Sequence, residues 1–169
     1  FKEDRAEFKR RDGSLATTTE VLVSAEDAAE VRRVSVLNAG TRVRDIDITS
    51  YAELVLAPQA SDVAHPAFSK LFVETEYLAH AGVLLATRRR RTPNEPEIWA
   101  AHLAVIDGDA VGTPQVETDR ARFLGRGGSV RSPVAITDGR PLSNTVGTVL
   151  DPVFALRRRV LLEPGAMVR

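Results

Sequence analysis

The carboxylates are the residues of this chain whose spacing most invites an enzymatic interpretation. Glycosyl transfer commonly uses two carboxylates, one as acid or base and one as base or nucleophile. Glu74 with Glu76, and Glu117 with Asp119, are spaced so that a β-strand would place each pair on one face. Because this spacing is common by chance, we interpret all four as solvated surface groups. The sequence therefore predicts no catalytic residue in this chain.

Metal and nucleophile sites have no clear signature either. His65, His80 and His102 lie in separate segments and lack the spacing of zinc ligands. The chain has no cysteine and no Gly-x-Ser-x-Gly elbow. We therefore predict no metal ion and no other cofactor.

Arginine clusters are the strongest local charges. The run Arg88 to Arg91 is followed by Glu95 and Glu97, so we interpret it as solvated side chains in ion pairs. An interface with another domain, a sugar or a phosphate is the alternative. Arg157 to Arg159 is interpreted in the same way. Gly125 to Gly128, of sequence Gly-Arg-Gly-Gly, lacks the Lys-Ser/Thr ending of a phosphate-binding loop and is interpreted as a mobile loop.

Trp99 is the only tryptophan of the chain. A platform for stacking on a sugar ring requires an exposed aromatic side chain. Trp99 lies in the predicted strand Ile98 to Ile106, so we expect it in the core.

The stretch from Val31 to Ala57 organises the elements that must position these side chains. The apolar residues of its second half share one parity: Ile46, Ile48, Ala52, Leu54 and Leu56. A period of two residues predicts a strand with one buried face. Asn38 to Thr41 supplies turn residues between the two halves. The pattern predicts one long β-hairpin.

Short predicted strands and frequent turns fill the rest of the chain. Further strands are predicted at Leu15–Ser24, Val83–Thr87, Ile98–Ile106 and Val146–Leu162, the last interrupted by Pro152, and after Glu163–Gly165. Phe1 to Arg11 is predicted to be an edge strand or a frayed end before a hairpin turn at Asp12-Gly13. Pro58 to Pro66 is predicted as a loop, and Ala67 to Leu78 as mostly extended. Asp119 to Leu124 is predicted as a single helical turn that ends at Gly125. This pattern favours an all-β antiparallel sandwich.

The bulk composition narrows the class of protein. The chain has 169 residues, 43% of them hydrophobic, which suits one globular domain. Its 23 basic and 23 acidic residues balance, which argues against a nucleic-acid partner. No apolar run approaches the roughly 20 residues that span a bilayer, so we expect no membrane insertion by this segment. The chain begins without Met, and we expect residues 1–169 to be a single domain of a longer multidomain protein.

Six stretches together resemble the β-sandwich regions of bacterial cyclic β-1,2-glucan synthases. The stretches are Arg32–Val36, Thr49–Pro58, His65–Glu76, Trp99–His102, Glu117–Gly127 and Leu150–Phe154. These regions are related to the N-terminal sandwich of the cellobiose and chitobiose phosphorylases of glycoside hydrolase family 94. The resemblance implies an antiparallel supersandwich, similar to galactose-mutarotase-like domains, that is truncated at the front.

The same resemblance implies an accessory function. In the family the sandwich precedes an (α/α)-barrel that holds the catalytic carboxylates, so this fragment is not expected to be an enzyme. Its implied partners are β-glucan, the adjacent barrel of the same polypeptide and a second copy in a homodimer. The parent is implied to be a glycan-processing protein of the bacterial inner membrane, with this domain on the cytoplasmic face.

A polar segment, Asp119 to Gly128, is the predicted contact with glycan or barrel. Arg120, Arg122 and Arg126 would donate to sugar hydroxyls, and Asp119 would accept from them. The alternative is a purely structural interdomain or dimerisation scaffold that binds no sugar.

Overall fold

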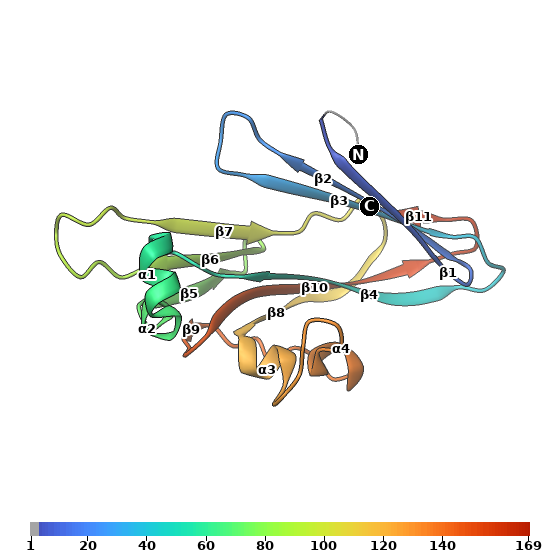
Figure 1. Ribbon diagram of the computed structural model, residues 1–169. Helices are drawn as coiled ribbons and strands as arrows, with labels where there is room; N and C mark the ends of the chain where they lie inside the picture. Colours follow the sequence, from blue (N-terminus) through green and yellow to red (C-terminus); the bar gives the residue numbers. More distant parts are fainter. Residues whose placement is uncertain (1–3) are drawn as a thin grey trace. The chain divides into compact units, whose positions relative to one another are not determined.

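The computed structural model describes residues 4–169, so the first three residues of the predicted Phe1–Arg11 edge segment lie outside the described residues. Within this range the chain forms eleven strands and four short helices (Figure 1). The strands are β1 Ala6–Asp12, β2 Leu15–Val23, β3 Glu30–Asn38, β4 Arg44–Glu53, β5 Val73–Leu78, β6 Val83–Arg88, β7 Trp99–Leu103, β8 Ala110–Asp119, β9 Gly147–Thr148, β10 Pro152–Leu162 and β11 Met167–Val168. The helices are α1 Gln59–Ala64, α2 Pro66–Lys70, α3 Arg120–Leu124 and α4 Val134–Thr137.

The strands form three sheets with the orders β1-β2-β3-β11, β4-β10-β8 and β7-β6-β5-β9. The pairings within the two four-stranded sheets are antiparallel, and the fold is all-β as predicted. The chain divides into two compact units. Unit 1 comprises the described part of Phe1–Asp47 with Val105–Gly112 and Arg159–Arg169, and unit 2 comprises Ile48–Ala104 with Thr113–Arg158.

Unit 1 contains the sheet β1-β2-β3-β11. β1 is an edge strand that turns into β2 at Gly13, whose φ of +60° is a conformation that glycine adopts without strain. The edge strand and the hairpin turn at Asp12-Gly13 are therefore confirmed. Val36 and Val168 pair across β3 and β11 and are both buried.

The long hairpin predicted from Val31 to Ala57 is wrong, although both of its strands exist. β3 pairs with β2 on one side and β11 on the other, so neither edge of β3 is left for β4. β4 instead lies beside β10. Asn38 ends β3 within unit 1, where its buried side-chain amide donates to the carbonyls of Arg42 (2.8 Å) and Leu162 (3.0 Å). The predicted turn residue is thus bound to a distant strand.

The core of unit 2 lies on one side of the sheet β7-β6-β5. Its buried residues are Leu54, Val73, Leu84, Ala86, Val116, Phe154 and Leu156. Leu54 directly follows β4, and Ala52 and Leu56 of the same parity pack against this cluster. The predicted alternation of the Ile46–Leu56 stretch is therefore confirmed, with Asp45, Asp47 and Glu53 exposed on the other parity.

The segment from Pro58 to Lys70 corrects two predictions. It contains α1 and α2, where a loop and an extended segment were expected. Pro66 occupies the first position of α2, where its fixed φ favours a helix and its missing N–H costs no hydrogen bond. The hydroxyl of Ser69 is buried and donates to the carbonyl of Ser61 (3.3 Å), which ties the two helices together.

Two predictions of burial are also wrong. Trp99 is 54% exposed, because β7 is an edge strand and Trp99 lies on the face opposite Ala100 and His102, which point to the core. Arg157 is only 4% exposed instead of solvated. Its guanidinium donates to Thr49 Oγ1 (3.0 Å) and to the carbonyls of Arg140 (3.0 Å) and Ala135.

No helix among the described residues is both long enough and apolar enough to cross a bilayer.

Candidate functional site

The helix α3 positions the residues that the sequence singled out. Asp119 ends β8 and caps α3, because its carboxylate accepts from the backbone N–H groups of Ala121 (2.8 Å) and Arg122 (3.4 Å). Gly125 ends the helix with a φ of +81° and donates its N–H to the carbonyl of Ala121. The predicted helical turn is therefore confirmed. Phe123 faces the interior, whereas the side chain of Arg122 faces solvent.

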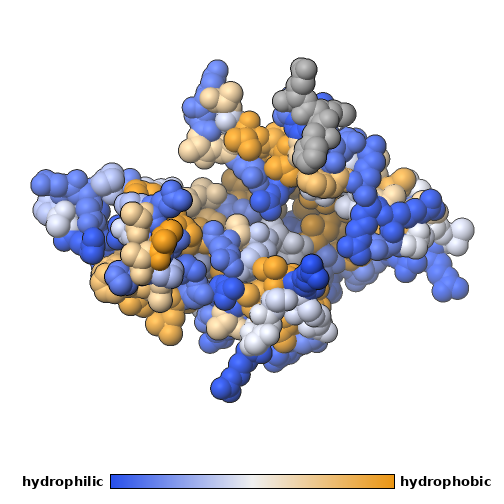
Figure 2. Space-filling model, in the orientation of Figure 1, coloured by the Kyte–Doolittle hydropathy of each residue, from blue (hydrophilic) through white to orange (hydrophobic). Residues whose placement is uncertain are grey.

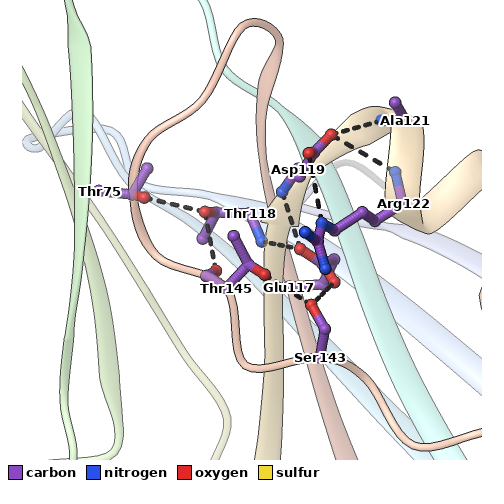
Figure 3. Close-up of polar contacts among 8 residues, drawn as sticks. All are labelled: Thr75, Glu117, Thr118, Asp119, Ala121, Arg122, Ser143 and Thr145. Carbon is purple, nitrogen blue, oxygen red and sulfur yellow. Dashed lines mark hydrogen bonds and ion pairs between the residues drawn. The ribbon is translucent and has the colours of Figure 1, made fainter.

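Glu117, which was interpreted as a solvated surface group, is buried with 2% of its surface exposed. Its carboxylate accepts from the N–H groups of Thr118 (3.1 Å) and Asp119 (3.0 Å) and from the hydroxyl of Ser143 (Figure 3). Thr118 and Asp119 end β8 just before α3, and the N–H of Thr118 also donates to the carbonyl of Thr145 (3.2 Å). Glu117 and Asp119 are thus both engaged in holding the backbone.

A chain of hydroxyl groups continues this buried network. Thr118 accepts from the hydroxyl of Thr75 on β5 (2.9 Å) and donates to the carbonyl of Thr145 (2.9 Å). The N–H of Gly147 donates to the Thr75 hydroxyl (3.0 Å). Figure 3 shows Thr75, Thr118 and Thr145 linked to one another beside the end of β8. Fully satisfied networks of this kind hold a loop in one position, and here they fix the end of β8 from which α3 projects.

Arg120 is held in a cluster of charges, here called the Arg120 cluster. Its guanidinium pairs with Glu53 (3.0 Å) on β4 and with Asp151 (3.6 Å) before β10. Lys70 of α2 also pairs with Asp151 (2.6 Å), and the hydroxyl of Tyr51 donates to Glu53 (3.1 Å). These partners occupy Arg120, so it serves to anchor α3 to β4.

The Arg120 cluster shifts the pKa values of its members. The hydrogen bond from Arg120 holds the pKa of Glu53 below its ordinary value, and the Glu53 carboxylate in turn raises the pKa of Arg120. Burial, followed by the neighbouring charge of Glu53, raises the pKa of Tyr51 to about 12. At neutral pH the cluster therefore contains a neutral phenol that donates to a carboxylate.

Arg122 and Arg126 are the predicted residues most accessible to a ligand. Arg122 is exposed and makes one ion pair, with Asp119 at 3.6 Å. Arg126 is exposed, and its side chain has no hydrogen bond or ion pair within the described part of the chain. Gly128 closes the turn that follows. Only glycine fits at this position, because a Cβ there would lie 1.9 Å from the carbonyl oxygen of Leu124. This turn holds Arg126 close to the end of α3.

A pocket of about 360 Å³ lies beside α3 and was not predicted. Its lining includes Thr49, Tyr51, Phe123, Arg131, Pro133 and Ile136. The rings of Tyr51 and Phe123 are stacked, with centroids 4.8 Å apart. Tyr51 lies on the parity of β4 that otherwise carries mainly polar residues such as Asp45, Asp47 and Glu53, and this is a sequence signal that could have indicated the pocket. An aromatic wall beside a guanidinium suits a small polar ring with hydroxyl groups.

The structure brings together only some of the predicted residues. Asp119 and Arg122 are in contact, whereas Arg120 is turned toward Glu53 and Asp151. Across residues 4–169 no three His, Asp or Glu side chains gather in a way that could hold a metal ion. The accessible donors of the site are thus Arg122, Arg126 and, in the pocket, Arg131.

Comparison with known proteins gives a family for the whole chain. The model of the family "Glycosyl hydrolase 94, supersandwich domain" matches residues 1–169. The cyclic beta-(1,2)-glucan synthase NdvB of Rhizobium meliloti is 44% identical over 168 residues, which is 99% of this chain and 6% of that protein. The solabiose phosphorylase of Paenibacillus borealis is 28% identical over 156 residues, 92% of this chain and 19% of that protein. The chain thus spans a small part of the length of these relatives.

Proposed function

Because this chain belongs to the supersandwich domain family of glycosyl hydrolase 94, we propose that it is a non-catalytic carbohydrate-binding domain of a cyclic β-1,2-glucan synthase. In this proposal it supports an adjacent (α/α)-barrel that processes β-glucan. The observation that carries the proposal is the 44% identity to such a synthase over 99% of the chain. The domain would act at the cytoplasmic face of the bacterial inner membrane, as part of a membrane protein.

The α3 surface is the proposed glucan contact. Arg122 and Arg126 present guanidinium groups that donate to sugar hydroxyls, and the pocket beside them adds the stacked rings of Tyr51 and Phe123. Asp119 and Arg120 contribute indirectly, because they hold α3 in place. Glucan, the barrel and a second copy of the domain are the proposed partners.

A structural scaffold is the second candidate, and one observation favours it. The α1–α2 segment exposes Val63 (76%), Phe68 (52%) and Leu71. Figure 2 shows apolar side chains over α1 and α2, interspersed with polar ones. Exposed apolar surface can mark a protein interface. In this function the domain would pack on the barrel or dimerise without binding sugar.

Calorimetric titration of the chain with linear and cyclic β-1,2-glucans tests the first function. We expect saturable binding at millimolar glucan or below, and about tenfold weaker binding by the Arg122→Ala/Arg126→Ala variant, because two charged donors are lost. The matched control is Arg32→Ala/Arg42→Ala, which removes the same charge from two exposed arginines of unit 1.

The control variant should bind like the unmodified chain. Absence of saturable heat at millimolar glucan would overturn the binding function and favour the scaffold. Equal affinities of the two double variants would leave glucan binding intact but remove it from the α3 surface.

A further inference from the structure

A second surface of unit 2, the outer face of the sheet β7-β6-β5, carries residue types that are suited to binding a sugar. The register aligns Glu74, Thr87 and Trp99 in one row across the three strands. Alternate residues of each strand point the same way, and the opposite face carries the buried Thr75, Ala86 and half-buried Ala100. Trp99 therefore lies on an exposed sheet face in line with a carboxylate.

The indole of Trp99 is both exposed and held in orientation. Its ring N–H donates to the carboxylate of Glu97 two residues earlier (3.1 Å). β7 is the edge strand of its sheet, with no strand of residues 4–169 paired to its outer edge, and Trp99 is 54% exposed. The small side chain of Ala101 follows on the same face. A fixed and open aromatic ring is the requirement for stacking on the C–H face of a pyranose.

The carboxylates on this face supply the polar part of the platform. Glu74 and Glu76 of β5 are exposed, and within residues 4–169 neither has a hydrogen bond or ion pair. Two strand spacings place Glu74 about 10 Å from Trp99, which is within reach of a glycan stacked on the indole. Ionised carboxylates accept hydrogen bonds and do not donate, so they match the hydroxyl groups of a sugar.

The polar groups of this face suit a neutral ligand. Glu97 holds the indole N–H, Glu74 and Glu76 lie two strands away on β5, and the exposed Arg89 continues the same parity just after β6. Charges of both signs therefore lie on or beside this face. A neutral glycan combines an apolar C–H face with many donors and fits the indole and the carboxylates together.

We propose that the outer face of β5, β6 and β7 is a second binding surface for neutral β-linked glucan, in which Trp99 stacks on a glucosyl ring and Glu74 and Glu76 accept from its hydroxyls. This inference rests on the proposed carbohydrate-binding function and adds a site remote in sequence from α3. It also gives the glycan two points of attachment on one domain.

Intrinsic fluorescence tests this site directly, because Trp99 is the only tryptophan. We titrate the chain with linear β-1,2-gluco-oligosaccharides and follow its tryptophan emission, with calorimetry on the same samples. The expected result is a saturable change in emission that persists in the Arg122→Ala/Arg126→Ala variant. The affinity obtained from this emission change should be severalfold weaker in the Glu74→Gln/Glu76→Gln variant.

Substitution of the ring provides the second arm. By calorimetry, Trp99→Ala should lose the binding event that the emission reports, or weaken it about tenfold, and Trp99→Phe should retain part of it. The matched control is Phe8→Ala, which removes an equally exposed aromatic (56%) from the edge strand β1 of unit 1. Circular dichroism of each variant shows that it is folded.

The outcomes separate this inference from the proposed function. Saturable heat without any change in emission, or equal binding by Trp99→Ala and Phe8→Ala, would overturn the Trp99 site and leave carbohydrate binding in place. Absence of heat and of emission change at millimolar oligosaccharide would overturn both.

Discussion

Tyr51 connects the pocket beside α3 with the Arg120 cluster. Its ring stacks on Phe123 and lines the pocket, while its hydroxyl donates to Glu53. Because burial, and after it the charge of Glu53, disfavours the phenolate, the phenol stays neutral above its ordinary pKa of 10.0. The neutral form is favoured by the fold, so this group stabilises the domain below about pH 10 and loses that contribution as the pH rises through about 12.

A tyrosinate titration checks the state of this residue. With Tyr77→Phe as background, Tyr51 is the only tyrosine, and only about a tenth of it should be ionised near pH 11. Adding Glu53→Gln should lower its pKa part of the way toward 10, because burial, the larger cause, remains. Near-ultraviolet absorbance measures the ionised fraction, and Glu95→Gln is the control. An unchanged midpoint in Glu53→Gln would contradict the proposed coupling.

The short helix α4 is held in place by a residue of a distant strand. α4 has four residues, too few to be stable alone. Arg157 of β10 donates to the carbonyl of Ala135 within α4 and to that of Arg140 just after it. Phe123 and Leu124 of α3 share a buried cluster with Ala135, and Figure 1 shows α3 and α4 side by side. The wall of the pocket therefore depends on one buried guanidinium.

Substitution of Arg157 should lower the free energy of unfolding far more than substitution of its neighbour Arg158. Arg157→Ala leaves buried carbonyls without donors and should lower the free energy of unfolding by about 2–3 kcal/mol. Arg158→Ala, in the same strand, should change it by less than about 0.5 kcal/mol. Urea unfolding of both variants measures the difference. Equal midpoints would show that the hydrogen bonds to α4 contribute little to stability.

At the scale of the whole molecule, charge balance is the property with the clearest consequence. The chain has 23 basic and 23 acidic residues, and several exposed arginines pair with nearby carboxylates, as Arg159 does with Asp45 and Asp47. The chain therefore carries no net positive charge to neutralise a phosphate backbone. Binding to nucleic acid depends largely on such neutralisation.

We therefore expect no appreciable binding to duplex DNA or RNA. Fluorescence anisotropy with labelled duplexes at near-physiological salt should give a dissociation constant weaker than about 10⁻⁴ M, the weak end of non-specific binding. A basic DNA-binding domain serves as the positive control. Micromolar binding that weakens with salt would contradict this expectation and point to a basic patch.

Local features of the sequence determined much of the fold. The alternation that buries Leu54, the hairpin turn at Gly13 and the helical turn from Asp119 to Gly125 all follow from neighbours in the chain. Residues within a few positions of one another control turn geometry, capping and strand parity, so a sequence reveals them. The polar character of this segment likewise agrees with the exposure of Arg122 and Arg126, whereas their contact with glucan stays a prediction.

Only the tertiary structure decided which strands pair and which side chains are buried. β3 pairs with β11, more than a hundred residues later, instead of with β4. Arg157 is buried because Thr49 and α4 close over it, Glu117 because Ser143 does, and Trp99 is exposed because β7 ends its sheet. Burial is the sum of contacts from distant parts of the chain, and no local pattern of residue types contains that sum.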